Sequence, residues 1–422
     1  MSFAPSELQK EIAALSSEIE AQKAILDDLI GRRSRAQRNL NAVLDPMARL
    51  PLELQSKIFV LCLPDDRYKL PSRPNPKLAP MLVSNVCHLW QDIALSTPEL
   101  WTHVWMESSP RPANYFLLYG IWLERSCSLP VFLILESTSV LAEAVKRLVD
   151  RAAPRVEQFS LHLSASPHDE YRIPRLPFQS LKRLNIAVQD QKPFNVYDWI
   201  DFMRMSPGLS YFSFSASFSR VVAVDFQFFT LAALKELHLG EHFASDEPNI
   251  NPTMLLKYIT LPALETLGIH CCRIIPDLIS DFTAFILRSS PPLRSLAIDC
   301  TFRVRTPTVE YLYAVPTLET LTLSTSDCVS VLERLATAPA FLPRLQHLTC
   351  SQSWMLTRDD FEVVVRMFSI RSLRTFRLNF LFVPNPFGGS AEPPDEDILV
   401  ELRRIRDSGV DIYIGDKEQN LV

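Results

Sequence analysis

The sequence predicts a mixed α/β protein that begins with a long helix, continues through a small helical domain and ends in a solenoid. In that solenoid we expect parallel strands inside, with helices and loops outside. Three observations predict this fold class: heptad spacing near the N-terminus, short apolar helical segments around a proline-rich stretch, and an apolar pattern that recurs nine times. The expected domains are residues 1–45, 46–128 and 129–422.

Residues 6–44 are predicted to form one continuous helix, because no proline lies between Pro5 and Pro46. The helix carries the 4-3-4-3 apolar spacing of a coiled coil with one polar member, at Leu8, Ile12, Leu15, Ile19, Gln22, Leu26 and Leu29. Two alternatives follow: the helix packs back on its own chain, or it forms a homodimer with a second copy. A basic run near its end is either a solvated helix face or a nuclear-import signal.

Residues 46–105 contain short helices around a proline-rich stretch. Pro51 suits the first turn of a helix, where its missing N–H costs nothing. Residues 64–80 hold five prolines and are predicted to form an irregular loop. A second helical segment is expected from Met81, and a turn at residues 97–101 leads into an apolar stretch.

The rest of the chain repeats the pattern L-x-x-L-x-L, in which other apolar residues replace some of the leucines. Successive copies begin 25 to 30 residues apart, at Val156, Leu181, Leu209, Leu234, Leu264, Leu293, Leu318, Leu345 and Leu373. This period and pattern match leucine-rich repeats, in which each unit supplies a strand and a helical connection. A small polar residue is expected at the ninth position of each copy, and six of the nine are Ser, Thr or Cys.

Helical connections are predicted at residues 281–287 and 331–335. The last unit is expected to be a helix over 397–407 that ends at Gly409, followed by a final strand over 410–414.

Composition favours a scaffold over an enzyme. The chain has 9 Gly among 422 residues, about 2% against a usual ~7%, whereas phosphate-binding loops need glycine. No nucleotide-binding or nucleophile-elbow motif occurs. His270, Cys271 and Cys272 are adjacent on a strand, so they point to alternating sides and do not share a metal ion. We therefore expect no catalytic residue, no cofactor and no metal.

Charge and hydropathy also limit the expected partners. The chain has 43 Lys and Arg against 48 Asp and Glu, a balance that is unlike that of dedicated nucleic-acid or polybasic membrane binders. Charged residues interrupt residues 1–30, which excludes a signal peptide. The most apolar stretch, residues 115–123, is too short to span a bilayer. With eight cysteines in no framework spacing, we expect an intracellular protein, cytoplasmic or nuclear, without nucleic-acid or membrane partners.

Residues 46–105 resemble an F-box, the segment that binds the small adaptor Skp1. Three pieces carry the resemblance: Leu50-Pro51-x-Glu53-Leu54-x3-Ile58-Phe59, Val83-Ser84-x-Val86-Cys87-x2-Trp90-x2-Ile93-Ala94, and Pro98-Glu99-Leu100-Trp101. With an N-terminal coil before it and irregular leucine-rich repeats after it, nearly the whole chain resembles the fungal F-box-like family. The proline-rich stretch 64–80 departs from the pattern, because it lengthens the gap between the first two pieces.

The resemblance implies a substrate-recognition adaptor that holds Skp1, and through it a cullin, and presents a protein substrate to a cullin-RING ubiquitin ligase. The implied Skp1-binding residues are Leu50, Pro51, Leu54, Ile58, Phe59, Val86, Trp90, Leu100 and Trp101. Two alternatives remain. The helical segment is the N-terminal cap of the solenoid, or the whole chain is a non-catalytic leucine-rich-repeat scaffold without a ligase role.

The repeat register also predicts a partner-binding surface on the concave side of the strands. Two columns of residues alternate with the strand leucines and point away from them. The expected substrate-binding residues are Ser160, Asn185, Ser213, His238, His270, Asp299, Thr322, Thr349 and Arg377. Only Asp299 and Arg377 are charged in these columns, so the surface suits a protein segment and not a phosphate backbone.

Overall fold

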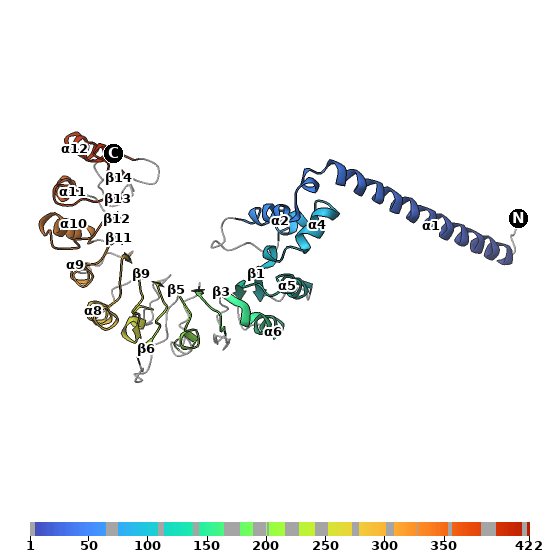
Figure 1. Cartoon of the computed structure of the whole chain (residues 1–422), viewed down its shortest axis with the longest axis horizontal. Helices are drawn as coiled ribbons and strands as arrows, with labels where there is room; N and C mark the ends of the chain where they lie inside the picture. The colour runs from blue at the N-terminus through green and yellow to red at the C-terminus, as the bar shows by residue number, and fades with distance from the viewer. Residues whose placement is uncertain are drawn as a thin grey trace. The chain divides into compact units, whose positions relative to one another are not determined.

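The structure is a computed structural model of the whole chain (Figure 1). None of the helices in its described part is both long and apolar enough to cross a membrane. The ninth positions of the nine repeat copies all lie outside the described residues. The structure describes residues 5–64, 75–108, 114–137, 143–163, 178–188, 200, 202–215, 228–240, 252–271, 278–300, 308–325, 327–352, 357–380, 394–415 and 420–422.

The chain divides into two compact units. The first unit comprises Met1–Trp105 and Gly120–Leu129, and the second unit comprises Met106–Tyr119 and Pro130–Val422. The first unit is mainly helical and the second is built on a parallel sheet, so the fold is mixed α/β as predicted.

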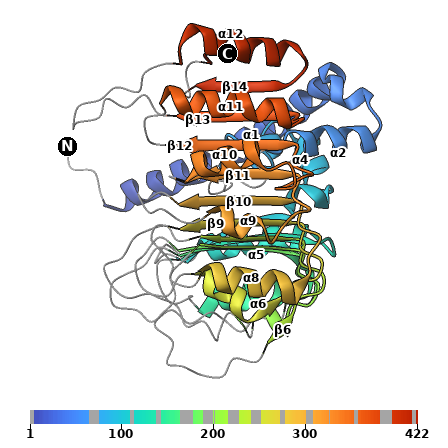
Figure 2. The same cartoon turned by 90° about the vertical axis from the view of Figure 1, so that its left-hand side faces the viewer.

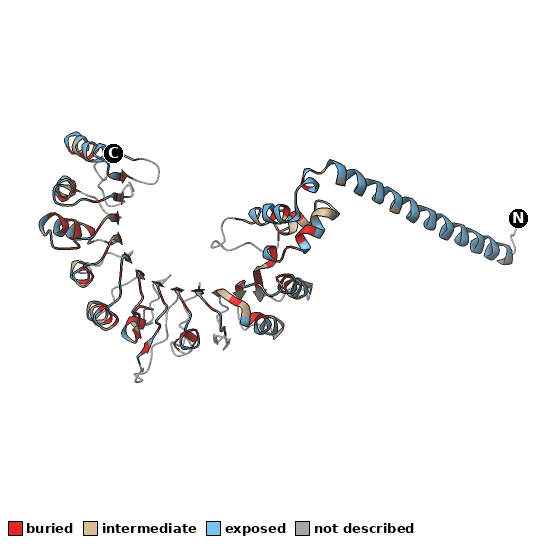
Figure 3. Ribbon diagram, in the orientation of Figure 1, coloured by how far each residue is buried: buried red, intermediate tan, exposed pale blue. Residues whose placement is uncertain are grey.

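The first unit starts with α1, a helix of 40 residues that spans Pro5–Leu44. This confirms the continuous helix predicted from the absence of internal proline. Each residue of α1 from Glu7 to Ile30 is exposed in the chain (Figure 3). The heptad seam is therefore uncovered by the residues that the structure describes.

Short helical elements follow α1. They are η1 (Pro46–Arg49), α2 (Leu52–Leu61), α3 (Met81–Ser84), α4 (His88–Leu95) and η2 (Pro98–Trp101). The segment predicted as helical from Met81 is divided into α3 and α4. The division has a local cause, since the Asn85 N–H closes a turn on the Leu82 carbonyl at 3.1 Å, and Cys87 is extended (φ −158°, ψ 172°).

Trp101 forms one centre of the core of the first unit and is only 1% exposed. Its Nε1 donates a hydrogen bond to the Ala94 carbonyl at 2.8 Å. Its ring meets the edge of Trp122, on α5 (Asn114–Arg125), at a centroid distance of 5.3 Å. The Arg125 guanidinium lies 4.5 Å from the Trp101 ring centroid. Edge-to-face and cation–π geometries of this kind add to the stabilisation from burial.

A second part of this core joins α2 to the start of α4. Phe59 is buried, and its ring lies 5.1 Å from that of Trp90. Trp90 Nε1 donates to Asp45 Oδ2 at 2.6 Å, while Asp45 Oδ1 accepts from the Met47 N–H at 2.8 Å. Asp45 thus caps η1 and orients Trp90 with the same carboxylate.

The second unit is built on a sheet of twelve strands in the order β1-β2-β3-β4-β5-β7-β9-β10-β11-β12-β13-β14. The pairings from β2 to β14 are parallel, and Figure 2 shows β9 to β14 running in one direction. A separate parallel pair contains β6 (Phe229–Thr230) and β8 (Ile259–Thr260). The strands of the large sheet are β1 (His103–Ser108), β2 (Val131–Ser137), β3 (Val156–Leu163), β4 (Arg183–Val188), β5 (Tyr211–Ser215), β7 (Glu236–Gly240), β9 (Thr266–Cys271), β10 (Ser295–Cys300), β11 (Thr320–Ser324), β12 (His347–Gln352), β13 (Thr375–Phe380) and β14 (Asp411–Gly415).

Helical connections of the second unit lie along one side of the sheet (Figure 1). The buried residues of α10 recur at helical spacing, as expected for a helix with one apolar face toward a core. The helices predicted at 281–287, 331–335 and 397–407 are found within α8, α10 and α12. The connections are α6 (Glu143–Ala152), η3 (Ala153–Arg155), η4 (Pro252–Lys257), α8 (Leu278–Ser289), α9 (Thr308–Leu312), α10 (Cys328–Thr337), α11 (Arg358–Ile370) and α12 (Glu396–Asp407).

The apolar repeat positions stack in register through the core. Leu184 pairs with Phe212, Phe212 with Leu237, and the same row continues without a shift to Ile412. The members of this row are all buried. In each of the nine copies the second and third apolar positions lie on a strand, which confirms the strands predicted from that pattern.

Two strands at the start of the sheet were not predicted. On β2, Leu133 pairs with Phe159 and Leu135 with Leu161, so β2 matches the last two apolar positions of the pattern. The first position of that copy falls three residues before Leu133, on Pro130, and 26 residues before Val156. Proline in place of leucine hides this copy, although its spacing agrees with the others.

A ladder of backbone hydrogen bonds runs along the starts of the strands. For example, the Ser210 N–H donates to the Lys182 carbonyl at 2.8 Å, and the Lys235 N–H donates to the Ser210 carbonyl at 2.9 Å. Ion pairs join neighbouring positions of the same row: Glu157 with Lys182, Lys235 with Glu265, and Arg294 with Glu319. These exposed pairs add little free energy each, but alternation of charge disfavours a shifted register.

The edge of β14 is partly covered by the last residues of the chain. The Leu421 N–H donates to the Ile414 carbonyl at 2.8 Å. Asn420 Oδ1 accepts from the Ile414 N–H at 3.1 Å and from the Val422 N–H at 3.3 Å. Val422 is 7% exposed. These contacts satisfy backbone groups that an open strand edge would present to another chain.

Candidate functional site

The first candidate surface is the face of the sheet that points away from the buried leucines, which we call the open face. Because side chains alternate along a strand, the residues between the buried positions point to this side. Among the predicted residues, seven share one column, and consecutive strand pairings join them in register. This first column contains Ser160, Asn185, Ser213, His238, Thr322, Thr349 and Arg377.

The other two predicted residues, His270 and Asp299, lie in the second column and are paired in register. Most of the predicted residues are half-buried, whereas Arg377 is exposed and Ser160 is buried at 8% exposure. The structure thus brings the predicted residues onto one continuous face of the sheet.

A third column on the open face was missed by the sequence reasoning. It lies two residues before the first column on each strand, and it adds charge and an aromatic ring to the face. Its members are Gln158, Arg183, Tyr211, Glu236, Thr266, Ser295, Thr320, His347, Thr375 and Asp411. The signal in the sequence is the residue that directly precedes the second apolar position of each copy.

A stacked cluster crosses β4, β5 and β7 on this face. The Arg183 guanidinium lies 3.9 Å from the Tyr211 ring centroid, and the Tyr211 and His238 rings are 5.6 Å apart. His238 is accommodated by Gly268 on the next strand, because a Cβ there would lie 2.4 Å from His238 Nδ1. The cluster offers an aromatic surface with one cationic end, which suits a peptide side chain or backbone.

Burial lowers the pKa of two histidines on the open face, His162 and His238. Burial lowers the pKa of His238, the Arg183 charge lowers it further, and Glu236 opposes these effects. Burial also lowers the pKa of His162, in the second column. Both side chains are therefore held neutral at pH 7 and can act as a hydrogen-bond donor and acceptor.

The two predicted charges on the open face are paired within the chain. Asp299 Oδ2 lies 3.0 Å from His270 Nδ1. Arg377 Nη2 lies 3.5 Å from Asp411 Oδ2, a member of the third column. Both charged side chains are therefore engaged within the chain, Asp299 by an imidazole nitrogen and Arg377 by a carboxylate.

The second candidate surface is formed by the predicted Skp1-binding residues of the first unit. Leu54, Ile58 and Val86 are 46%, 38% and 54% exposed, and Pro51 is exposed as well. Leu54 and Ile58 are spaced i, i+4 and share one face of α2. Apolar side chains that remain exposed in a compact unit are available to a partner.

The other predicted Skp1-binding residues are less accessible. Phe59, Leu100 and Trp101 are each 1% exposed and belong to the core of the first unit. Leu50 and Trp90 are half-buried. The three pieces of the motif do not distinguish these roles, because both the core and the outer face require apolar side chains.

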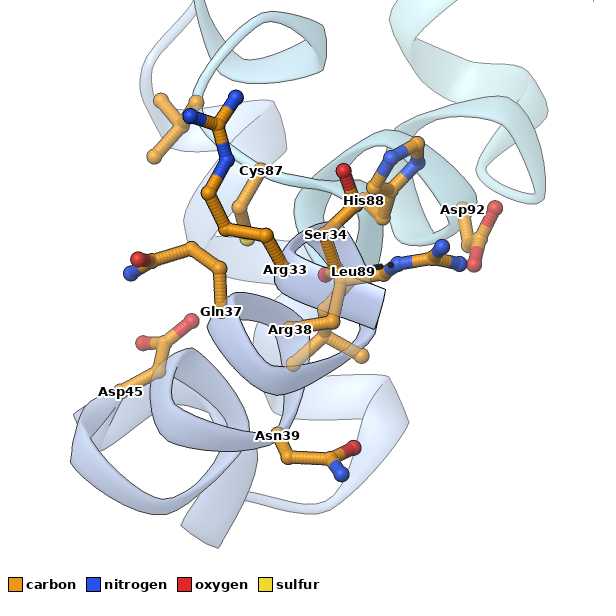
Figure 4. A pocket seen from close by; sticks show the side chains of 11 residues that line it. Arg33, Ser34, Gln37, Arg38, Asn39, Asp45, Cys87, His88, Leu89 and Asp92 are labelled. Atoms are coloured by element: carbon orange, nitrogen blue, oxygen red, sulfur yellow. Dashed lines mark hydrogen bonds between the residues drawn. The ribbon is translucent and has the colours of Figure 1, made fainter. Parts of the chain in front are cut away.

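A cavity of about 770 Å³ lies between the C-terminal part of α1 and the start of α4 (Figure 4). Arg33 and Arg38 line it from α1, and His88 and Asp92 line it from α4. Arg38 Nε donates to the Ser34 carbonyl at 3.3 Å. Charges of both signs line this cavity, which no motif in the sequence had indicated.

No protein-family model and no curated protein matches this chain. Among the described residues, no three His, Cys, Asp or Glu side chains are grouped closely enough to hold a metal ion. Shape and exposed chemistry are therefore the basis for a functional assignment.

Proposed function

We propose that the protein is an F-box-type adaptor that binds a Skp1-like protein through its first unit and a protein substrate through the open face. In this proposal a cullin is recruited through the Skp1-like protein, and the chain itself carries out no chemical step. The repeated strand-and-helix units are interpreted as a leucine-rich-repeat solenoid, supported by the 25- to 30-residue period and by the in-register parallel pairing.

The observation that carries the proposal is the exposure of apolar motif residues in the first unit. Leu54, Ile58 and Val86 belong to the pieces that resemble an F-box, and they remain uncovered while the unit has its own buried core. Exposed apolar side chains that a partner buries contribute binding free energy roughly in proportion to the apolar area that is removed from water.

One observation favours the alternative of a scaffold without a ligase role. Phe59, Leu100 and Trp101 occupy the core of the first unit, so part of the motif is explained by folding alone. A scaffold would keep these three residues and would show no loss of a partner when Leu54, Ile58 and Val86 change.

The test is binding of the full chain to a purified Skp1-like protein, measured by calorimetry. A variant with Leu54→Ala, Ile58→Ala and Val86→Ala is expected to lose affinity by at least about 30-fold, since one anchor costs on the order of 2 kcal/mol. The changed side chains are exposed, so circular dichroism is expected to show an unchanged fold.

The matched control changes three exposed apolar residues of the second unit: Leu117→Ala, Leu287→Ala and Val400→Ala. Their side chains are 67%, 74% and 55% exposed, and the control is expected to bind as the wild type does. Equal affinity of both variants, or no binding by the wild type, would support the scaffold alternative.

A further inference from the structure

Residues Leu8 to Ile30 of α1 carry a coiled-coil seam that no part of the described chain covers. The exposed fractions of its members are 45% for Leu8, 63% for Ile12, 52% for Leu15, 53% for Ile19, 56% for Leu26 and 51% for Leu29. The alternative in which the helix packs back on its own chain predicts burial of this stripe, and the described residues show none. A fully solvated apolar stripe of about 33 Å, at ~1.5 Å per residue, is costly unless a partner covers it.

We propose that two copies of the chain cover this seam as a parallel, in-register, two-stranded coiled coil. The heptad assignment places Ile12, Ile19 and Leu26 at a positions and Leu8, Leu15 and Leu29 at d positions. Ile at a with Leu at d is the combination that favours parallel dimers over trimers and tetramers. This inference does not depend on Skp1 binding.

The flanking positions agree with the parallel orientation. In a parallel pair each g residue faces the e residue of the next heptad on the other helix. Glu18 at g then faces Lys23 of the second copy, and Ile25 at g faces Ile30 at e. In the single chain Lys23 instead bonds Glu20 on its own helix, with Nζ and Oε1 2.8 Å apart. Ile25 and Ile30, 55% and 44% exposed, gain an apolar neighbour on the second helix in this arrangement.

Two polar residues define the register and the end of the coiled coil. Gln22 at d faces Gln22 of the second copy only when the helices are in register, and the two amides then hydrogen-bond each other. Arg33 follows at the next a position, where two copies would place like charges together. In the chain Arg33 instead lines the cavity beside α4 (Figure 4). The seam therefore ends where α1 starts to line the cavity beside α4.

The first experiment is sedimentation equilibrium of the full chain at micromolar concentration, which is expected to show a dimer. Ile19→Glu with Leu26→Glu is expected to raise the dissociation constant at least about 100-fold and give a monomer. The control, Ala21→Glu with Ala24→Glu, adds the same charge on the outer face of α1 at the same level and is expected to leave the dimer intact. A monomeric wild type, or equal loss in both variants, overturns the proposal.

The second experiment tests orientation and register by charge exchange. Glu18→Lys alone and Lys23→Glu alone are each expected to weaken the dimer by about 10-fold, because each creates two repulsive pairs. The double variant restores attraction only if residue 18 faces residue 23 of the second copy, so it is expected to recover wild-type affinity. In an antiparallel pair these residues do not meet, and a double variant as weak as the single ones overturns the parallel assignment.

Discussion

The imidazole of His238 occupies space on the open face that only a glycine at position 268 leaves free. A Cβ at Gly268 would lie 2.4 Å from His238 Nδ1 and 3.2 Å from its Cε1. The Tyr211 ring lies on the other side at a centroid distance of 5.6 Å, tilted by 43° to the imidazole. The shape of the stacked cluster therefore depends on the smallest residue of the neighbouring strand.

Gly268→Ala is expected to displace His238 and to lower the free energy of unfolding by about 1–2 kcal/mol, as overpacking does elsewhere. The control is Gly240→Ala, where the closest atom to the new Cβ is Ser215 Oγ at 3.3 Å, and its cost is expected to stay below about 1 kcal/mol. Urea denaturation measures both variants. Equal stability of Gly268→Ala and wild type would contradict the assigned packing.

His238 is also expected to make stability depend on pH. Its folded-state pKa is lowered from 6.5, so the unfolded chain binds more protons as the pH falls through that value and below it. The free energy of unfolding then decreases on acidification. His238→Gln, which keeps a neutral polar side chain, is expected to reduce the drop in melting temperature between pH 7.5 and pH 5.5. The variant is expected to keep part of the pH dependence, because burial also lowers the pKa of His162.

The control for the pH measurement is Ser213→Ala, which changes the neighbour of His238 in the first column and adds no titratable group. This variant is expected to keep the wild-type pH dependence. If the melting temperatures of His238→Gln and the wild type decrease by the same amount on acidification, His238 does not contribute to the pH dependence of stability.

At the scale of single elements, the positions of the strands were predictable because the same apolar pattern occurs nine times. Each occurrence places apolar residues on the same buried face of a strand. The β2 copy was missed because Pro130 replaces its first leucine. The division between α3 and α4 was missed because it depends on the extended conformation of Cys87, which no residue type signals. The third column was missed because only residues after the second apolar position were considered.

The strand β14 lies at one end of the sheet, and the last residues of the chain partly cover its edge. Deleting residues 420–422 removes the hydrogen bonds to Ile414 and uncovers the strand edge. We expect the free energy of unfolding to fall by about 2–4 kcal/mol from lost burial and hydrogen bonds. Aggregation on heating, measured by light scattering, is expected to start at a lower temperature.

The single substitution Asn420→Ala separates the two contributions to this effect. It removes the side-chain acceptor of the Ile414 and Val422 N–H groups and leaves the main chain over the edge. Its cost is expected to be about 1–2 kcal/mol, with little change in aggregation. Wild-type behaviour of the deletion variant would show that the last residues do not protect β14.

At the scale of the whole molecule, the proposed function assigns the two partners to different units. A variant with Asn185→Ala, His238→Ala, Asp299→Ala and Arg377→Ala changes the first and second columns of the open face and leaves the first unit unaltered. It is expected to retain Skp1 binding and to lose protein partners identified by quantitative capture with the wild type. An unchanged set of partners would place recognition outside the open face.

The roles of the F-box-like residues were only partly predictable, for a physical reason. The motif specifies apolar residues, and both a buried core and a partner interface require them. Leu54 and Phe59 have similar apolar character in the sequence, yet they are 46% and 1% exposed. Only the packing of α2 against Trp90 separates them. The exposure of the α1 seam could not be predicted either. Heptad spacing predicts an apolar stripe on the helix, but it does not predict which surface packs against that stripe.

The in-register pairing of neighbouring strands has a consequence for how this protein can change over generations. Each strand presents the same buried row to both neighbours, so duplication or loss of one whole unit by unequal recombination recreates compatible junctions on either side. A gain of part of a unit would instead place polar side chains in the core. Gain, loss or exchange of whole units can therefore lengthen, shorten or alter the open face, because each unit contributes its own residues to that face.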